Sequence, residues 1–134
     1  MAIQVNIEKN FKGFSLKSVF ESNTSATGIL GASGSGKSMT LRCIAGIETP
    51  DRGKIVIKGR TVFDSEKKIN LKPQERRIGY LFQNYALFPT MTVKDNILCG
   101  YRGEKGQREE KARDFMKRYQ LEGLENRYPS QLSG

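Results

Sequence analysis

The chain has 134 residues, of which 37% are hydrophobic and 28% charged, a balance that suits one globular domain. The 23 Lys and Arg against 14 Asp and Glu give a net charge of +9, and two cysteines without any histidine exclude a disulfide framework or a Cys/His zinc site. No apolar stretch approaches the roughly 18 residues of a membrane span. The alternating N-terminal residues also predict a folded segment and no signal peptide, so we expect a cytosolic protein.

The N-terminal part of the chain reads as strands. Apolar residues alternate with polar ones over residues 3–7, which predicts a half-buried strand, and residues 16–20 are its expected partner across a turn at Lys12-Gly13. The short apolar run 26–30 ends at a glycine. It predicts a buried strand that leads into a loop.

A helix is expected after that loop, because the apolar residues of 41–45 fit one helical face and Gly46 can end it. Residues 54–58 and 60–64 predict two strands, and residues 78–82 predict a further apolar strand. Near the C-terminus, apolar residues recur with helical spacing and predict a helix with one buried face: Ala112, Phe115, Met116 and Tyr119.

The positive charge falls in two stretches. In the first, oppositely charged residues at i,i+4 spacing predict a solvated helix face: Glu104–Arg108, Glu109–Arg113 and Asp114–Arg118. The second is a basic cluster of Lys67, Lys68, Lys72, Arg76 and Arg77. This cluster lacks the interleaved aromatics of a nucleic-acid stacking platform, so the charge favours a solvated surface or a preference for phosphate ligands. Cys43 and Cys99 are predicted to be buried free thiols.

Residues 31–38, GASGSGKS, match the phosphate-binding P-loop pattern G-x-x-x-x-G-K-[ST]. Glycines let backbone N–H groups approach a phosphate, and the start of the following helix adds unpaired N–H groups and the positive end of its dipole. We expect Lys37 to contact the β- and γ-phosphates and the Ser38 hydroxyl to ligate Mg²⁺. The predicted phosphate contacts comprise Gly31, Ala32, Ser33, Gly34, Ser35, Gly36, Lys37, Ser38 and Met39.

Other motifs narrow the class of P-loop protein. The D-x-x-G and N-K-x-D strings of a small GTPase do not occur, whereas a P-loop kinase with residues 102–118 as its lid stays open as an alternative. A Walker B strand, an apolar run ending in Asp that helps to hold Mg²⁺, is missing. The nearest candidate, residues 62–64, is too short and too polar.

Two further segments carry a family resemblance. Residues 72–97, KPQERRIGYLFQNYALFPTMTVKDNI, resemble the Q-loop region of ABC transporter ATP-binding subunits, and residues 129–134, PSQLSG, resemble the start of their LSGGQ signature. The resemblance implies an α/β P-loop NTPase of the ABC ATPase type, with an antiparallel β region, a partial parallel core and a helical subdomain. It divides this partial domain into a β-rich nucleotide-binding part at about residues 1–90 and a helical subdomain at about residues 91–134. The short N-terminus and the strings KNFKGFSL and ALFPTMTV look most like the molybdate-type importer ATPases.

The resemblance also implies roles for single residues. Gln83 would sense Mg²⁺ and the attacking water, which makes it a catalytic and metal-site candidate together with Lys37 and Ser38. Phe14 would stack on adenine, with Phe11 as the second candidate and a place in the strand core as the alternative. Met39 stands where many relatives have Ser or Thr, so a weaker contact to the α-phosphate is expected.

Contacts with partner subunits are implied in the same way. The groove for the coupling helix of a transmembrane permease would be formed by Tyr85, Leu87, Phe88 and Pro89. These residues could equally belong to the core of the helical subdomain. Ser133 and Gly134 would reach the γ-phosphate bound to the second ATPase subunit of a head-to-tail dimer.

The function that follows is the ATP-binding subunit of an ABC importer, which uses ATP and Mg²⁺ and lies in the cytoplasm, on the inner face of the membrane, through its permease. The family's Walker B, catalytic Glu, D-loop and switch His are missing from these 134 residues, so the chain by itself is expected to bind nucleotide at best. One alternative is an ABC ATPase with a nucleic-acid or translation partner, against which Phe88-Pro89 argues, so no nucleic-acid partner is expected. The other is a folded fragment without nucleotide affinity.

Overall fold

The structure is a computed structural model that describes residues 2–83 and 87–132. The chain divides into two compact units, Met1–Tyr80 and Leu81–Gly134. Among the described residues, no helix has the length and apolar character needed to cross a membrane.

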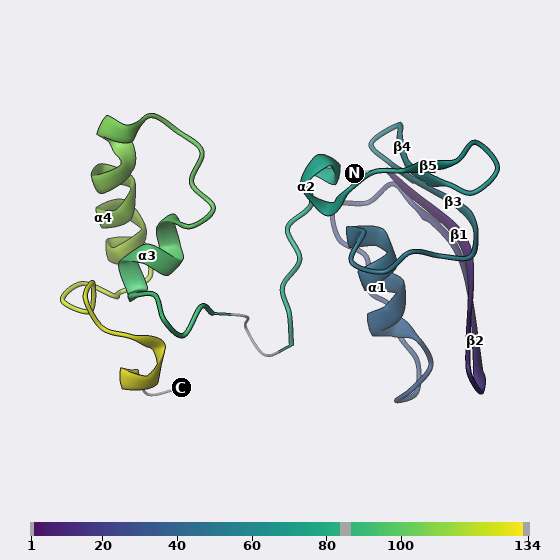
Figure 1. Ribbon diagram of the computed structural model, residues 1–134, viewed down its shortest axis with the longest axis horizontal. Coiled ribbons are helices and arrows are strands. Elements are labelled where there is room, and N and C mark those ends of the chain that lie inside the picture. Colours follow the sequence, from purple (N-terminus) through teal and green to yellow (C-terminus); the bar gives the residue numbers. More distant parts are fainter. Residues whose placement is uncertain (1, 84–86, 133–134) are drawn as a thin grey trace. The chain divides into compact units, whose positions relative to one another are not determined.

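The described part of the first unit contains one sheet of five strands, in the order β2-β1-β3-β4-β5, and every neighbouring pair is antiparallel (Figure 1). The strands are β1 Ile3–Phe11, β2 Phe14–Ser22, β3 Arg52–Ile57, β4 Arg60–Asp64 and β5 Ile69–Asn70. β1 and β2 form the predicted hairpin, in which Phe11 pairs with Phe14 across the turn at Lys12-Gly13. The predicted strand pair β3–β4 is also confirmed.

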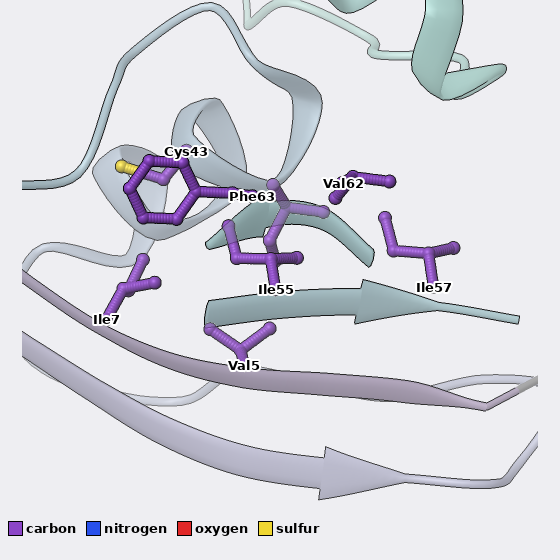
Figure 2. Close-up of a cluster of buried hydrophobic side chains, with 8 residues drawn as sticks. Val5, Ile7, Cys43, Ile55, Ile57, Val62 and Phe63 are labelled. Atoms are coloured by element: carbon purple, nitrogen blue, oxygen red, sulfur yellow. The ribbon is translucent and has the colours of Figure 1, made fainter. Parts of the chain in front are cut away.

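One face of the sheet is covered by a helix. The helices of this unit are α1 Lys37–Ala45 and α2 Pro73–Arg76. Figure 2 shows the core between α1 and the sheet, to which β1, β3, β4 and α1 each contribute two residues: Val5, Ile7, Ile55, Ile57, Val62, Phe63, Cys43 and Ile44. In β1 and β3 the alternation places the apolar side chains on this one face, which is the physical origin of the pattern seen in the sequence. In β4 the consecutive residues Val62 and Phe63 are both buried in the core, where the β3–β4 register shifts between Ile55 and Val56.

A buried arginine ties the end of α1 to the segment that follows β5. Arg76 is 4% exposed, and its Nη1 donates to the carbonyl oxygens of Cys43 at 2.7 Å and Ile44 at 2.9 Å. Its Nε donates to the Leu71 carbonyl at 2.8 Å and its Nη2 to Asn70 Oδ1 at 2.9 Å. Burial lowers the pKa of this guanidinium from its ordinary value. The prediction that Arg76 belongs to a basic surface cluster is therefore wrong, because it caps the carbonyl end of α1.

Two predicted strands do not form. Residues 26–30 and 78–82 have no strand pairing, and Leu30 and Leu81 are 97% and 80% exposed. A strand of a parallel core is buried on both faces and needs neighbours on its sides. Within the described residues no strand pairs with either segment. The expected parallel core is thus not formed there, and Leu41 of α1, which belongs to the predicted apolar face of the helix, is 45% exposed.

The second unit is helical, as predicted. Its described elements are α3 Val93–Leu98, η1 Lys105–Gln107, α4 Arg108–Arg118 and η2 Pro129–Gln131. On α4, Ala112 and Met116 are buried as expected, but Phe115 and Tyr119 are 39% and 60% exposed and stack on each other at 6.1 Å between ring centroids. The buried face of α4 is therefore narrower than the four-residue periodicity predicts.

Two surface predictions for the chain also need correction. Among the ion pairs of the described residues, Glu109 contacts Lys94 of α3, and none of the three predicted i,i+4 pairs is formed. Cys43 is buried as predicted, whereas Cys99 is exposed. Cys99 is the C-cap of α3, where the chain leaves the helix into an exposed turn, and its Sγ donates to the Asn96 carbonyl at 3.0 Å.

Candidate nucleotide-binding site

The glycine-rich segment 31–38 leads directly into α1. Gly34 and Gly36 have positive φ values of 79° and 91°, and Gly36 is the N-cap of the helix. A Cβ atom on Gly36 would lie 2.5 Å from Cδ1 of Leu16 and 3.3 Å from Cζ of Phe14. Glycine is therefore required at this position by the left-handed backbone and by the close approach of β2. The sequence pattern and the local geometry agree.

The ammonium group of Lys37 is enclosed by the loop that precedes it. Nζ donates to the carbonyl oxygens of Gly31 and Ala32, both at 2.6 Å, and to Ser35 Oγ at 3.4 Å. Within the described residues no carboxylate forms an ion pair with it. Its hydrogen bonds are satisfied but its charge is not neutralised, which favours an anion that can displace the carbonyl groups.

The first turn of α1 supplies the backbone donors. Thr40 N donates to the Gly36 carbonyl at 2.8 Å, the first bond of the helix, so the N–H groups of Lys37, Ser38 and Met39 precede the hydrogen-bonded ladder. Ser38 is exposed, and the Met39 side chain packs against the core cluster. An anion at this end of α1 would meet unpaired N–H groups and the positive end of the helix dipole. Ser38 offers the only hydroxyl on the exposed side of this turn among the described residues 37–39.

The predicted adenine-stacking residue lies at the same end of α1. Phe14 is 40% exposed, and its ring passes close to Gly36, as the distance from Cζ shows. Phe11, the second candidate, stacks on Phe14 with 6.2 Å between centroids and an interplanar angle of 26°. Phe14 therefore has an accessible ring beside the P-loop.

The remaining predicted site residues belong to the second unit. Gln83 is exposed, at the start of that unit. Leu87, Phe88 and Pro89 are also exposed, so the alternative that they belong to the core of the helical subdomain does not hold for these three. The predictions for Tyr85, Ser133 and Gly134 fall outside the described residues.

An asparagine that the sequence did not single out fixes the 88–92 segment. Asn96 Oδ1 accepts from the Phe88 N–H at 2.8 Å, and its Nδ2 donates to the carbonyl oxygens of Phe88, Met91 and Thr92 at 3.0–3.1 Å. Thr92 caps α3, accepting from Asp95 N at 3.2 Å. The T-x-x-D spacing predicts the start of the helix, but it does not predict the hydrogen bonds that Asn96 forms. Asn96 therefore fixes the backbone of this turn, whose apolar side chains are exposed.

The described residues do not assemble a metal site of protein carboxylates. They contain no group of three or more Cys, Asp or Glu that could hold a metal ion. Asp64, the nearest candidate for a Walker B aspartate, is 5% exposed, and its Oδ1 accepts from the N–H groups of Glu66 at 3.1 Å and Lys67 at 3.0 Å. Asp64 therefore stabilises the turn between β4 and β5.

Comparison with protein families and curated proteins gives a consistent result. The family model described as ABC transporter matches residues 19–134. The probable sulfate/thiosulfate import ATP-binding protein CysA of Chlorella vulgaris is 40% identical over 135 residues, which cover 96% of this chain and 55% of the relative. The sulfate/thiosulfate import ATP-binding protein CysA of Pseudomonas putida is 39% identical, over 100% of this chain and 42% of the relative.

Solved structures show the same likeness. The dimeric structure of MJ0796, described as a bacterial ABC transporter cassette, has a TM-score of 0.72 and 27% identity, and the match covers 100% of this chain and 64% of that one. A post-hydrolysis state of the same cassette, bound to ADP and Pi, has a TM-score of 0.67 and 26% identity, over 99% of this chain and 63% of that one. This chain thus spans about half the length of these curated relatives and less than two thirds of the solved cassettes.

Proposed function

The chain belongs to the ABC transporter family, and we propose that it forms the nucleotide-binding part of an importer's ATPase subunit, which binds ATP with Mg²⁺ and couples hydrolysis to transport. The observation that carries the proposal is the Lys37 ammonium, held by the Gly31 and Ala32 carbonyls beside the N-terminus of α1 with no carboxylate partner among the described residues. A helix N-terminus and an unneutralised cation favour a phosphate group there.

Each predicted site residue has a role in this proposal. Residues 31–36 and the N–H groups of Lys37, Ser38 and Met39 surround the phosphates, and Lys37 is the catalytic cation. The Ser38 hydroxyl is a ligand for Mg²⁺, which would neutralise phosphate charge when bound, and Gln83 is the second metal-site and catalytic candidate. Phe14 supports the adenine.

The proposed partners are a second ATPase subunit and a transmembrane permease. Exposed Leu87, Phe88 and Pro89, next to the turn that Asn96 holds, support a docking surface for the permease, to which Tyr85 is also assigned. Ser133 and Gly134 are assigned to the nucleotide of the second subunit. The subunit would then lie in the cytoplasm, at the inner face of the membrane, without a nucleic-acid partner.

The proposed cargo is an oxyanion. The motif strings look most like molybdate-type importers, whereas the relatives CysA carry the description sulfate/thiosulfate import. Molybdate, sulfate and thiosulfate are all tetrahedral oxyanions, so we assign the class and leave its member to the permease, which contacts the cargo.

We further propose that these 134 residues bind nucleotide without efficient hydrolysis. A general base must stand within hydrogen-bond reach of the attacking water. Asp64, the one described acidic residue at the end of an apolar strand, is engaged by the turn at Glu66 and Lys67. A phosphate-release assay with Mg·ATP should give a rate no higher than that of the Lys37→Ala variant.

Calorimetric titration of Mg·ATP into the chain tests the proposed function. Wild type should bind with saturation, and Lys37→Ala should raise the Kd at least about tenfold, since charge-assisted bonds are worth about 1.5–3 kcal/mol each. Lys67→Ala is the matched control, because it removes one positive charge from an exposed position of the same unit. It should change the Kd by less than about twofold. Equal binding by wild type and Lys37→Ala would refute the proposal.

A further inference from the structure

A lysine occupies the core-facing side of the hairpin close to the aromatic pair. Lys9 pairs with Leu16 in the β1–β2 register, two residues before the pair Phe11–Phe14, so its side chain lies on the same face as both rings. Its Nζ lies 5.3 Å from the centroid of the Phe11 ring. Phe11 in turn stacks on Phe14, whose ring lies against Gly36 of the P-loop.

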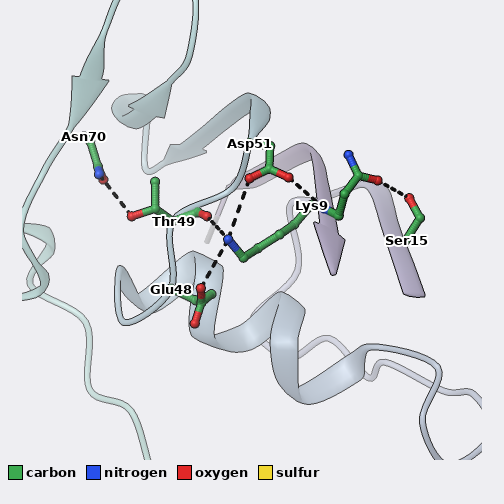
Figure 3. Close-up of polar contacts among 7 residues, drawn as sticks. Lys9, Ser15, Glu48, Thr49, Asp51 and Asn70 are labelled. Carbon is green, nitrogen blue, oxygen red and sulfur yellow. Dashed lines mark hydrogen bonds and ion pairs between the residues drawn. The ribbon is translucent and has the colours of Figure 1, made fainter. Parts of the chain in front are cut away.

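The ammonium of Lys9 is anchored on its other side by the segment between α1 and β3. Nζ donates to the Thr49 carbonyl at 2.8 Å and pairs with Glu48 Oε1 at 3.2 Å and Asp51 Oδ1 at 3.7 Å (Figure 3). Asp51 Oδ2 also accepts from the Asn10 N–H at 2.7 Å. The Lys9 side chain is only 14% exposed, which places these contacts in a medium where they are stronger than at an open surface.

We propose that Lys9 is a positioning residue for the nucleobase platform: it holds Phe11, and Phe11 holds the ring of Phe14 in the plane on which a base stacks. The inference rests on the proposed nucleotide binding and extends it to the part of the ligand that the P-loop does not touch. Lys9 itself contacts no ligand in this scheme.

The ring of Phe14 is only partly packed against the rest of the unit. A ring that is 40% exposed and stands at the first position after a two-residue turn has few neighbours to fix its orientation. Its ring stacks on that of Phe11 and lies close to Gly36, and glycine offers no side chain to direct it. Phe11 is fixed through the cation over its ring, an interaction that is worth more when the cation is desolvated.

The stacked pair therefore links the 48–51 segment to the P-loop end of α1. Loss of the Lys9 cation would free Phe11 to change its rotamer, and Phe14 would follow. Phosphate contacts made by Lys37 and the start of α1 would persist, because none of them involves Lys9. The expected signature is a loss of affinity that depends on the base.

The test compares Mg·ATP with inorganic tripolyphosphate, which carries the phosphates without a base, in titrations of the whole chain. Lys9→Met should raise the Kd for ATP at least about threefold, a partial loss of the stacking free energy. Its Kd for tripolyphosphate should stay within about twofold. Lys9→Arg keeps the cation and should restore most of the ATP affinity. Lys17→Met is the matched control, because Lys17 is 70% exposed and its only ion pair in the described residues is with Glu8.

The outcomes separate the two proposals. Equal weakening of ATP and tripolyphosphate by Lys9→Met, or no weakening of ATP, would overturn the positioning role. If Lys9→Met loses its folded circular dichroism signal, the proposal is tested with Lys9→Arg and Phe11→Leu instead. For the proposal to hold, Phe11→Leu must weaken the binding of ATP and leave the binding of tripolyphosphate unchanged. Wild type that binds both ligands equally would refute the base platform and leave the P-loop function standing. Wild type that binds neither would refute the proposed function itself.

Discussion

Replacing Arg76 with methionine removes the charged group that closes the C-terminal end of α1 while keeping most of its aliphatic volume. Three carbonyl oxygens, those of Cys43, Ile44 and Leu71, lose their guanidinium donor, as does Asn70 Oδ1. Hydrogen bonds to a charged group are worth about 1.5–3 kcal/mol each, whereas the desolvation of the buried guanidinium offsets several kcal/mol of that sum. We expect Arg76→Met to lower the free energy of unfolding by roughly 3–5 kcal/mol.

That loss is large beside the roughly 5–15 kcal/mol that stabilises a typical domain. It is measured by urea denaturation followed by circular dichroism at 222 nm. Arg77→Met is the control, since the neighbouring side chain is exposed and should contribute within about 0.5 kcal/mol. Similar midpoints for the two variants would refute the argument that Arg76 clamps α1.

Three further predictions follow from the contacts described. Asn96→Ala should lower the stability of the second unit by about 1–2 kcal/mol and speed chymotrypsin cleavage after Leu87 and Met91, whereas Asn126→Ala, at an exposed turn, should do neither. At pH 8 a disulfide reagent should modify exposed Cys99 at once and buried Cys43 only after denaturation; equal rates would contradict the burial of Cys43. Burial raises the pKa of the Cys43 thiol from 9.0 to about 11, so the folded state keeps this proton longer than the unfolded state. The difference in unfolding free energy between wild type and Cys43→Ala, measured in urea, should be largest below pH 9 and should decrease between pH 9 and 11. A difference that increases with pH would refute this prediction.

The sequence predicts best those features that depend on neighbours close in the chain. The hairpin β1–β2 follows from alternation on both sides of a tight turn, and the P-loop from glycines and the start of a helix within eight residues. The fold class, an ABC-type P-loop NTPase, is confirmed by the family match and by the solved cassettes. All of these are local patterns or ordered sets of local patterns.

The two strands predicted at residues 26–30 and 78–82 depend on distant neighbours instead. An apolar run shows that a segment can be buried on both faces, but burial needs strands and helices on either side. With no strand paired to its segment in the described residues, Leu30 stays almost fully exposed. An apolar run thus predicts a capacity for burial, and the surroundings decide whether that capacity is used.

The polar residues that sequence reasoning missed are those whose roles depend on tertiary contacts. Arg76 lies in a run of basic residues, and only its distance to the end of α1 separates it from exposed Arg77. Lys9 did carry a signal, because it occupies a core-facing position in the alternation that starts at Ile3. A charge at an inward position must be paired or hydrogen-bonded, since an unpaired buried charge is costly. The inward position of Lys9 in the strand pattern therefore indicates that this residue does more than pack. In the structure its ammonium is paired and lies over the ring of Phe11, at the P-loop end of the hairpin.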